Sequence, residues 1–404
     1  MKIALITTIT PASENIRGTS ALPYHLMAKR SKDIKVDIFS YNVNQLPQEK
    51  IHQVEQELDV RIHLVRWPLW LLWLVRLHLL MLRIFLRLPY LSYLRLPVSV
   101  VEEIKDGHPD GIWVYGEEIG GIMEQFPGYK RVHVGPDSEA LYYYRMLGQR
   151  FVVGDWRMYL RQTVMYPKYL RLERAYLSDT NAVYGVVGEA DAEFIHRMNP
   201  QSSPVFLRHP HYEVARQDTD AIHFHQPIRL LIAGRYDLYM RQSADELIGA
   251  LCHCGNELVK DSYEVTFLGK GWDILADGMR RAGWNVRHVT FAPNYVDEVM
   301  RHDVQLVPIS IGTGTKGKVL DALSNGLLVI GTPYAMENVA VEDGVSCIEY
   351  RSPERVVEVL ADMPLRLPFY EQMAERGRQS VLAVHQRERV SKQFFDLFLS
   401  KNYL

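Results

Sequence analysis

The chain has 404 residues, which is too long for one ordinary core, and its 47% apolar content is that of a folded globular protein. A net charge of −2 and a pI near 6.7 argue against a nucleic-acid-binding protein. Three cysteines are too few for a disulfide framework or a tetrahedral zinc site, so we expect a cytoplasmic protein with no metal site.

Short apolar runs alternate with helical stretches along the whole chain. They are KIALITTI, VDIFS and IWVYG in the first half, and IRLLIAG, YEVTFLG, VRHVTF, VQLVPI and LLVIGT in the second. This alternation is typical of parallel α/β sheets with crossover helices. We interpret the first run as a strand rather than a secretion signal, because no small-residue cleavage site follows it. A polar connector between the two sets predicts a domain boundary near residues 215–225.

The segment 67–96 combines leucines, tryptophans and arginines, and no acidic residue occurs from Val60 to Val101. We expect a helix whose arginines share one stripe and whose tryptophans lie at headgroup depth on a membrane surface. The arginines make a transmembrane span unfavourable. A buried helix whose arginines pair with carboxylates is the remaining alternative. The residues assigned to the membrane are Trp67, Trp70, Trp73, Arg76, Arg83 and Arg87.

A second basic and aromatic zone follows over residues 141–177. Aromatic and basic side chains interleave in single-strand nucleic-acid channels, but also on headgroup surfaces and in carbohydrate sites. The near-neutral pI disfavours nucleic acid here, and the other two interpretations stay open.

A glycine-rich turn, IGTGTKGKVLDALSNGLLVIGTP, occupies residues 311–333, between an apolar strand and a helix. We expect the helix to begin at residue 316 or 317 and to run to Ser324, ended by Asn325 and Gly326. At a helix N-terminus the backbone N–H groups and the macrodipole favour a bound anion, and the lysines of this turn add positive charge. On the motif alone, a tight turn with solvated lysines is an equal alternative.

With the segments around it, the turn resembles the donor-binding domain of GT-B glycosyltransferases, most similar to family 4, over nearly the full chain. Family members carry a GR dipeptide after the first strand of this domain, a basic residue near the next helix, a glycine turn after the second strand, and a loop that contacts the base. The matching positions are Gly234, Arg235, Arg241, Gly269, Lys270, Phe291, Ala292, Pro293 and Tyr295. The resemblance implies that Arg235 and Arg241 neutralise the donor diphosphate.

The glycine-rich turn itself is similar to the family's E-x7-E segment. There the first acid contacts the donor sugar, backbone amides hold phosphate and the second acid binds ribose. Asp321 takes the second acidic position, whereas Thr313 replaces the first glutamate, so the resemblance leaves the donor sugar open. Lys318 is expected to act in catalysis with the two arginines. The other donor-binding positions are Gly314, Thr315, Lys316, Gly317 and Val319.

In the first half, Gly18 and Thr19 occupy the place of the family's glycine turn, which closes over the donor. Asp137 follows a strand end and takes a cleft-facing position in the resemblance, so it is a candidate catalytic residue, with Glu117 and Glu118 expected beside it. A helix N-cap is an equally good interpretation of Asp137, because Asp-Ser before a helical run is a common helix start.

The resemblance implies a GT-B fold, with two Rossmann-like domains facing a central cleft. We expect an N-terminal acceptor-binding domain over residues 1–215, with the insertion at 67–96, and a nucleotide-sugar-binding domain over residues 225–385. A C-terminal helix over residues 386–404 is expected to pack back on the N-terminal domain.

The resemblance also implies a retaining, metal-independent glycosyltransferase without a cofactor. It would move a hexose from a nucleotide diphosphate sugar, for which we expect UDP, to a glycan or lipid-linked glycan in polysaccharide biosynthesis. We expect peripheral contact with the inner face of an anionic membrane and no nucleic-acid partner. A UDP-sugar 2-epimerase of the same fold and a non-catalytic nucleotide-sugar-binding protein are the alternatives. A nicotinamide dehydrogenase is disfavoured, because no GxGxxG follows the first strand.

Overall fold

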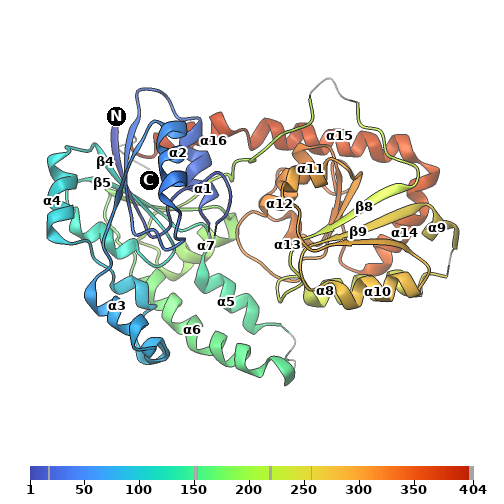
Figure 1. Cartoon of the computed structure of the whole chain (residues 1–404), viewed down its shortest axis with the longest axis horizontal. Helices are drawn as coiled ribbons and strands as arrows, with labels where there is room; N and C mark the ends of the chain where they lie inside the picture. The colour runs from blue at the N-terminus through green and yellow to red at the C-terminus, as the bar shows by residue number, and fades with distance from the viewer. Residues whose placement is uncertain (17–18, 150, 152, 218–220, 256, 400–404) are drawn as a thin grey trace. The chain divides into compact units, whose positions relative to one another are not determined.

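The computed structural model describes residues 1–16, 19–149, 151, 153–217, 221–255 and 257–399. The chain forms two compact units (Figure 1). Residues 1–210 and 387–404 make up the first unit, and residues 211–386 the second. Each unit is built on a parallel sheet with helices around it, so the predicted α/β class with two domains is confirmed.

The first unit contains a seven-stranded parallel sheet in the order β3-β2-β1-β4-β5-β6-β7. Its central strands are buried along their length, which is the pattern of a parallel sheet covered on both faces. The strands are β1 (Lys2–Thr7), β2 (Lys35–Ser40), β3 (Arg61–Leu64), β4 (Gly111–Tyr115), β5 (Lys130–Val134), β6 (Ala182–Val186) and β7 (Pro204–Phe206). The helices are α1 (Ala21–Ala28), α2 (Gln48–Leu58), α3 (Leu69–Arg76), α4 (Val98–Asp106), α5 (Glu139–Leu147), α6 (Trp156–Arg174), α7 (Glu189–Met198) and α16 (Arg387–Asp396).

The C-terminal helix α16 packs into the core of the first unit, as predicted. The Ser391 hydroxyl donates to the carbonyl of Leu26 in α1 over 2.6 Å, and the Phe394 ring lies 4.4 Å from the Trp113 ring of β4. All four residues are buried. The last helix of the chain therefore completes the core of the unit in which the chain begins.

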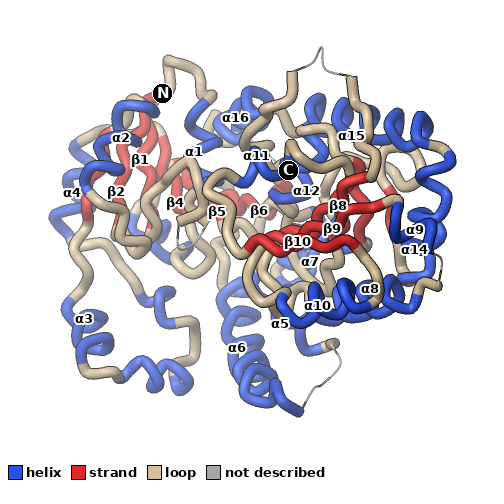
Figure 2. Tube along the Cα trace, turned by 45° about the vertical axis from the view of Figure 1, so that its right-hand side comes forward, coloured by secondary structure: helices blue, strands red, loops and turns tan. Residues whose placement is uncertain are grey.

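The predicted single helix over residues 67–96 is wrong. The helix α3 ends at Arg76, His78 adopts a left-handed φ of 55°, and only two short 3-10 helices follow, η1 (Leu79–Phe85) and η2 (Tyr90–Tyr93) (Figure 2). The three arginines therefore lie on separate turns instead of one stripe. Trp67 is half-buried with its ring 5.2 Å from that of Tyr41, whereas Trp70 and Trp73 are exposed.

Contacts with α6 hold this segment in place after α3 has ended. The buried Lys168 ammonium donates to the carbonyls of Arg83 and Ile84 over 2.6 and 2.9 Å. In a continuous helix these carbonyls would accept from amides four residues later in the chain. The segment thus exchanges helical hydrogen bonds for tertiary ones, which local sequence does not reveal. No helix of the described residues is both long enough and apolar enough to cross a membrane.

The second unit contains a six-stranded parallel sheet in the order β10-β9-β8-β11-β12-β13. The chain therefore builds outward from β8 to β10 and then restarts on the other side of β8 with β11. The strands are β8 (Ile228–Ala233), β9 (Tyr263–Leu268), β10 (Asn285–Val289), β11 (Val304–Val307), β12 (Leu328–Gly331) and β13 (Ile348–Glu349). The helices are α8 (Arg241–His253), α9 (Glu257–Asp261), α10 (Asp273–Arg281), α11 (Tyr295–Val299), α12 (Gly317–Ser324), α13 (Pro333–Met336), α14 (Pro353–Asp362) and α15 (Leu367–Val384), with a short 3-10 helix η5 (Met363–Leu365).

The connector before β8 begins as part of the second unit. The buried Asn325 side chain accepts hydrogen bonds from the N–H groups of Ala215 and Arg216, and its amide nitrogen donates to the carbonyl of Glu213. The division between the units falls between residues 210 and 211, earlier than the 215–225 expected from composition. Composition shows only where the sequence becomes polar. The boundary is earlier because these hydrogen bonds attach the backbone of residues 213–216 to the second unit.

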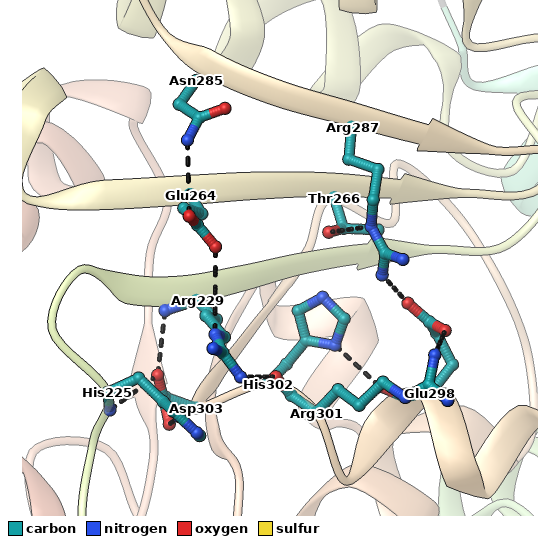
Figure 3. Close-up of polar contacts among 10 residues, drawn as sticks. All are labelled: His225, Arg229, Glu264, Thr266, Asn285, Arg287, Glu298, Arg301, His302 and Asp303. Carbon is teal, nitrogen blue, oxygen red and sulfur yellow. Dashed lines mark hydrogen bonds and ion pairs between the residues drawn. The ribbon is translucent and has the colours of Figure 1, made fainter.

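A cluster of paired charges covers one face of the second sheet, starting at the amino ends of its strands (Figure 3). Arg229, Glu264 and Asn285 are register partners on β8, β9 and β10, with 3.8 Å between Arg229 Nε and Glu264 Oε2. Further along, Arg287 of β10 forms an ion pair with the buried Glu298 of α11. We call this group the ion-pair cluster. Its members are His225, Arg229, Glu264, Thr266, Asn285, Arg287, Glu298, Arg301, His302 and Asp303.

Candidate functional site

A pocket of about 300 Å³ lies at the opposite, carboxyl edge of the second sheet. Strands β8, β9 and β10 all end beside it, so residues that follow three different strands form its wall. We call it the first pocket. It is lined by Ala233, Gly234, Arg235, Leu268, Gly269, Lys270, Thr290, Phe291, Ala292, Tyr295 and Lys318. Six of the sixteen donor-binding positions expected from the sequence are brought together here, with the expected catalytic residues Arg235 and Lys318.

Two glycines make this pocket possible, because the ends of β8 and β9 approach too closely for side chains. Gly234 and Gly269 have φ of 124° and 132°, which L side chains rarely adopt. A Cβ on Gly269 would lie 2.1 Å from the Gly234 carbonyl oxygen. That same carbonyl accepts a 2.7 Å hydrogen bond from the indole nitrogen of Trp272. The glycines thus leave the pocket open to a ligand at the level of the backbone.

A second pocket of about 220 Å³ adjoins the first and shares Arg235 and Lys318 with it. Its wall combines residues that follow β8 with residues that follow β11. These two strands are neighbours in the sheet, and the order of the strands reverses between them. Such a switch point is where open α/β sheets bind ligands. The second pocket is lined by Arg235, Asp237, Tyr239, Met240, Ile309, Ile311, Lys316 and Lys318.

Lys318, in the first turn of α12, is the cation that lies deepest in this site. Its ammonium donates to the carbonyl of Ala233 over 3.2 Å and lies 3.3 Å from the Met240 sulfur. Burial lowers the pKa of Lys318 to about 8; Asp237 opposes this shift and Lys316 adds to it. No described residue forms an ion pair with Lys318 or Arg235. The site therefore holds positive charge that the protein itself does not neutralise.

The glycine-rich turn places α12 as predicted, from Gly317 to Ser324, with Asn325 as the C-cap residue. Lys316 is the N-cap residue, and its ammonium bends back to donate to the carbonyls of Thr313 and Gly314 over 2.6 and 2.8 Å. Lys316 thus stabilises the turn as well as lining the second pocket.

Asp321 does not line either pocket. It is buried on α12 near Tyr295, a first-pocket residue whose pKa is raised by burial and by the Asp321 carboxylate. The Gln305 side-chain amide donates to the Tyr295 hydroxyl over 3.5 Å. In this geometry Tyr295 lies closer to the pocket than the carboxylate that the resemblance assigns to ribose.

Four expected residues of the glycine-rich turn line neither pocket: Thr313, Gly314, Thr315 and Gly317. The other expected positions of the second unit divide into wall, surface and core. Phe291 and Ala292 line the first pocket, and the Phe291 side chain is 74% exposed. Pro293 is exposed outside it, and Val319 is buried in the hydrophobic core. Arg241 is the first residue of α8 and lines neither pocket. Its backbone N–H donates to the Asp237 carbonyl.

Sequence reasoning missed eight lining residues: four apolar ones, Ala233, Leu268, Ile309 and Ile311, and four others, Thr290, Asp237, Tyr239 and Met240. Thr290 follows β10 directly, in the position that Gly234 and Gly269 occupy after their strands, so strand-end position was an available signal. Asp237, Tyr239 and Met240 lie in the loop between β8 and α8, where no motif marks them.

In the first unit, Asp137 is not the N-cap of α5. The cap is Ser138, whose hydroxyl accepts from the N–H of Leu141. Gly18 lies outside the described residues. Thr19, before α1, accepts a 2.7 Å hydrogen bond from the Tyr115 hydroxyl through its carbonyl.

Asp137 belongs to a group of carboxylates at the ends of β4 and β5, which includes Glu117, Glu118 and Glu139, as the sequence suggested for the first two. Burial raises the pKa of Glu139, and the charges of the other three add to the shift. Behind them, burial raises the pKa of Glu173 to about 7, although it accepts hydrogen bonds from the Ser138 hydroxyl and the Ala140 N–H. Across the described residues, no three His, Cys, Asp or Glu side chains are grouped so as to hold a metal ion.

No family model and no curated protein sequence matches the chain, but solved structures share its fold. It is similar to TarM, at 11% identity and a TM-score of 0.66, over 99% of both chains. WaaG, a glycosyltransferase involved in lipopolysaccharide biosynthesis, is 14% identical with a TM-score of 0.60, over 98% of this chain and 99% of that one. Anabaena Alr3699/HepE in complex with UDP is 12% identical with a TM-score of 0.62, over 98% and 99%. The chain therefore has the GT-B fold that the resemblance predicts.

Proposed function

We propose that the protein is a glycosyltransferase whose donor is a nucleotide diphosphate sugar. The observation that supports this most directly is the pair of adjoining pockets that share Arg235 and Lys318 at the switch point of the second sheet. A nucleoside in the first pocket and a sugar in the second place the diphosphate between them, beside the two shared cations. The glycines at the strand ends let a phosphate approach the backbone.

In this proposal the reaction depends on electrostatic stabilisation of the leaving group. The bond between the anomeric carbon and the diphosphate oxygen breaks, and the nucleoside diphosphate leaves with the electron pair. The acceptor hydroxyl oxygen bonds to the anomeric carbon, and its proton passes to the departing diphosphate oxygen. Arg235 and Lys318 are preorganised where negative charge increases, so they stabilise the transition state more than the ground state.

We further propose UDP as the nucleotide, a hexose as the sugar and a glycan or lipid-linked glycan as the acceptor. Alr3699/HepE, a structural neighbour, was solved in complex with UDP and with UDP-glucose. The exposed Phe291 ring, on the wall of the first pocket, offers a flat apolar surface for a base. Retention of configuration, independence of metal ions and a role in polysaccharide biosynthesis are carried over from the family 4 resemblance.

The test is turnover of a panel of nucleotide sugars, with and without glycan acceptors. Arg235→Ala is expected to lower turnover about 10²-fold, because one preorganised charge at the transition state is lost. Arg351→Ala is the matched control, since Arg351 is an exposed arginine of the same unit outside both pockets. Near-normal turnover by Arg235→Ala would contradict the proposed role. Formation of an epimer from a nucleotide sugar alone would favour the 2-epimerase instead.

We also propose that the first unit contacts an anionic membrane surface. The segment 69–85 exposes large apolar side chains next to exposed arginines, and the Lys168 hydrogen bonds join it to α6, whose first half exposes the same mixture. Neither residues 60–101 nor residues 156–172 contain an acidic side chain. The exposed apolar residues are Leu69, Trp70, Leu72, Trp73, Val75, Leu77, Leu79, Leu82, Ile84, Phe85, Trp156, Tyr159 and Leu160. Apolar and basic groups together bind anionic lipid headgroups.

Sedimentation with lipid vesicles tests the membrane contact. The unmodified protein is expected to bind vesicles that contain anionic lipid and to release them at high salt. Changing Arg76, Arg83 and Arg87 to Glu is expected to abolish binding. The matched control reverses three exposed arginines of the second unit, Arg351, Arg355 and Arg376. If the unmodified protein does not bind anionic vesicles, the membrane proposal is wrong.

A further inference from the structure

Among the described residues, the wall of the second pocket contains a single carboxylate, that of Asp237. In the family pattern, the acid that contacts the donor sugar comes from the glycine-rich turn, where this chain has Thr313. The Thr313 carbonyl accepts from the Lys316 ammonium, so positive charge faces the place where the pattern has a carboxylate. Asp237 enters the same pocket from the other side of the switch point, in the loop that follows β8.

The local structure holds the Asp237 carboxylate in place. Its backbone carbonyl accepts hydrogen bonds from the N–H groups of Met240 and Arg241 over 3.0 and 2.7 Å, which fixes the turn that leads into α8. One carboxylate oxygen, Oδ1, accepts a 3.1 Å hydrogen bond from the N–H of Tyr239. No described residue donates to the other oxygen, Oδ2. The side chain is half-buried, so its orientation is restricted while one oxygen keeps its capacity to accept.

The charges around Asp237 indicate which part of the donor it meets. Arg235 and Lys318 line both pockets, so the dianionic diphosphate belongs beside them. A carboxylate lying against the diphosphate would be repelled by it. Asp237 lines the second pocket but not the first. Among the described residues, no ion pair joins it to Lys318. The part of the donor assigned to the second pocket is the sugar, whose hydroxyls donate hydrogen bonds, and Asp237 lines that pocket close to Lys318.

We propose that Asp237 is the residue that recognises the donor sugar, with Oδ2 accepting a hydrogen bond from a sugar hydroxyl. This inference rests on the proposed function and deepens it: the acid missing from the glycine-rich turn is supplied from the loop after β8. The donor is then a sugar with a free hydroxyl at the contacted position, and the contact determines specificity.

The test compares Asp237→Asn with the unmodified protein, using UDP and whichever of UDP-glucose, UDP-galactose and UDP-N-acetylglucosamine the unmodified protein turns over fastest. Asn keeps the shape but weakens the acceptor, so kcat/KM for the UDP-sugar is expected to fall about 10- to 100-fold. The affinity for UDP, which lacks the transferred sugar that would contact Asp237, is expected to change less than about twofold. Asp245→Asn is the matched control, because Asp245 lies on α8 outside both pockets and accepts from the Tyr236 hydroxyl.

Deoxy-sugar donors locate the contact. The unmodified protein is expected to discriminate against one deoxy-UDP-sugar, and Asp237→Asn is expected to lose that discrimination, while its thermal midpoint stays within about 2 °C of the unmodified value. An equal loss of UDP affinity would overturn the inference, because Asp237 would then act through Lys318. Unchanged kcat/KM would also overturn it. If the unmodified protein neither binds UDP nor turns over any UDP-sugar, the proposed function fails and this inference fails with it.

Discussion

The two edges of the second sheet use the same kinds of charged residue in opposite ways. In the ion-pair cluster, Arg287 and Arg301 both pair with Glu298, and the buried Asp303 accepts from the His225 ring over 2.8 Å (Figure 3). At the carboxyl edge, the Lys318 ammonium contacts a carbonyl and a sulfur, and no described carboxylate forms an ion pair with it, although Asp237 is near enough to act on its pKa. One edge neutralises its own charges, and the other keeps positive charge for a ligand.

The difference separates structural charge from functional charge. A desolvated cation without an ion-pair partner destabilises the folded state, and the same desolvation lowers the pKa of Lys318 to about 8. Arg287 and Arg301 are paired and at least half exposed, so they carry much less of this cost, and their pairing leaves no anion site. Perturbed titration within a pocket is therefore a better indication of function than the number of charges. Four predictions test this comparison.

Replacing Lys318 by Met is expected to have the largest effect, in opposite directions on activity and stability. Turnover of a UDP-sugar should fall 10²-fold or more, because the charge at the diphosphate is lost. The free energy of unfolding at pH 7 should rise by about 1 kcal/mol, because an apolar side chain of similar length replaces a buried charge. Denaturant melts and single-turnover rates measure the two effects. A loss of stability would mean that Lys318 is mainly structural.

Glu298→Gln should show the reverse behaviour at the other edge. It leaves two arginines without their shared carboxylate. The unfolding free energy is expected to fall by about 1 to 2 kcal/mol. The loss is no larger because both arginines are at least half exposed, so solvent screens their charges. The affinity for UDP should not change. Isothermal titration of UDP checks this, and a parallel loss of affinity would show that the two edges are coupled.

The affinity for UDP should fall as the pH rises through 8. The Lys318 ammonium is charged below its pKa of about 8 and neutral above it, so a rise from pH 7 to pH 9 removes the charge that the diphosphate needs. The expected loss is up to about tenfold, since bound diphosphate raises the pKa and offsets part of it. Lys318→Arg keeps its charge over this range and serves as the control, with a flat profile expected.

The smallest effect is expected for Asn285→Ala, at the exposed margin of the ion-pair cluster. Asn285 donates to Glu264 over 3.4 Å; Asn285 is exposed and Glu264 is half-buried. Such a contact contributes little, so the unfolding free energy should change by less than about 0.5 kcal/mol, as measured by urea melts. A larger loss would show that the cluster acts as a cooperative network.

Much of the second unit could be predicted from sequence, because its signals are local. The strand runs, Gly234 and Gly269 after their strands, and the bounds of α12 all follow from a few consecutive residues. The segment 67–96 could not, because its apolar residues fit a helix as well as they fit short turns held by Lys168. The role of Asp137 was also ambiguous locally, since Asp-Ser offers two candidate caps and the structure uses Ser138.

By itself, the sequence determined the α/β class, the glycine-rich turn and the cations that a phosphate site needs, because backbone freedom and residue charge are properties of short segments. Only the tertiary structure decided which of these residues lie next to one another. Lys318 and the Ala233 carbonyl are 85 residues apart in the chain, and they touch because β11 returns to the side of β8 after β9 and β10 have formed the other side. The same return brings Asp237 into a pocket with Lys316, since parallel strands collect their carboxyl ends at one edge whatever their order in the sequence.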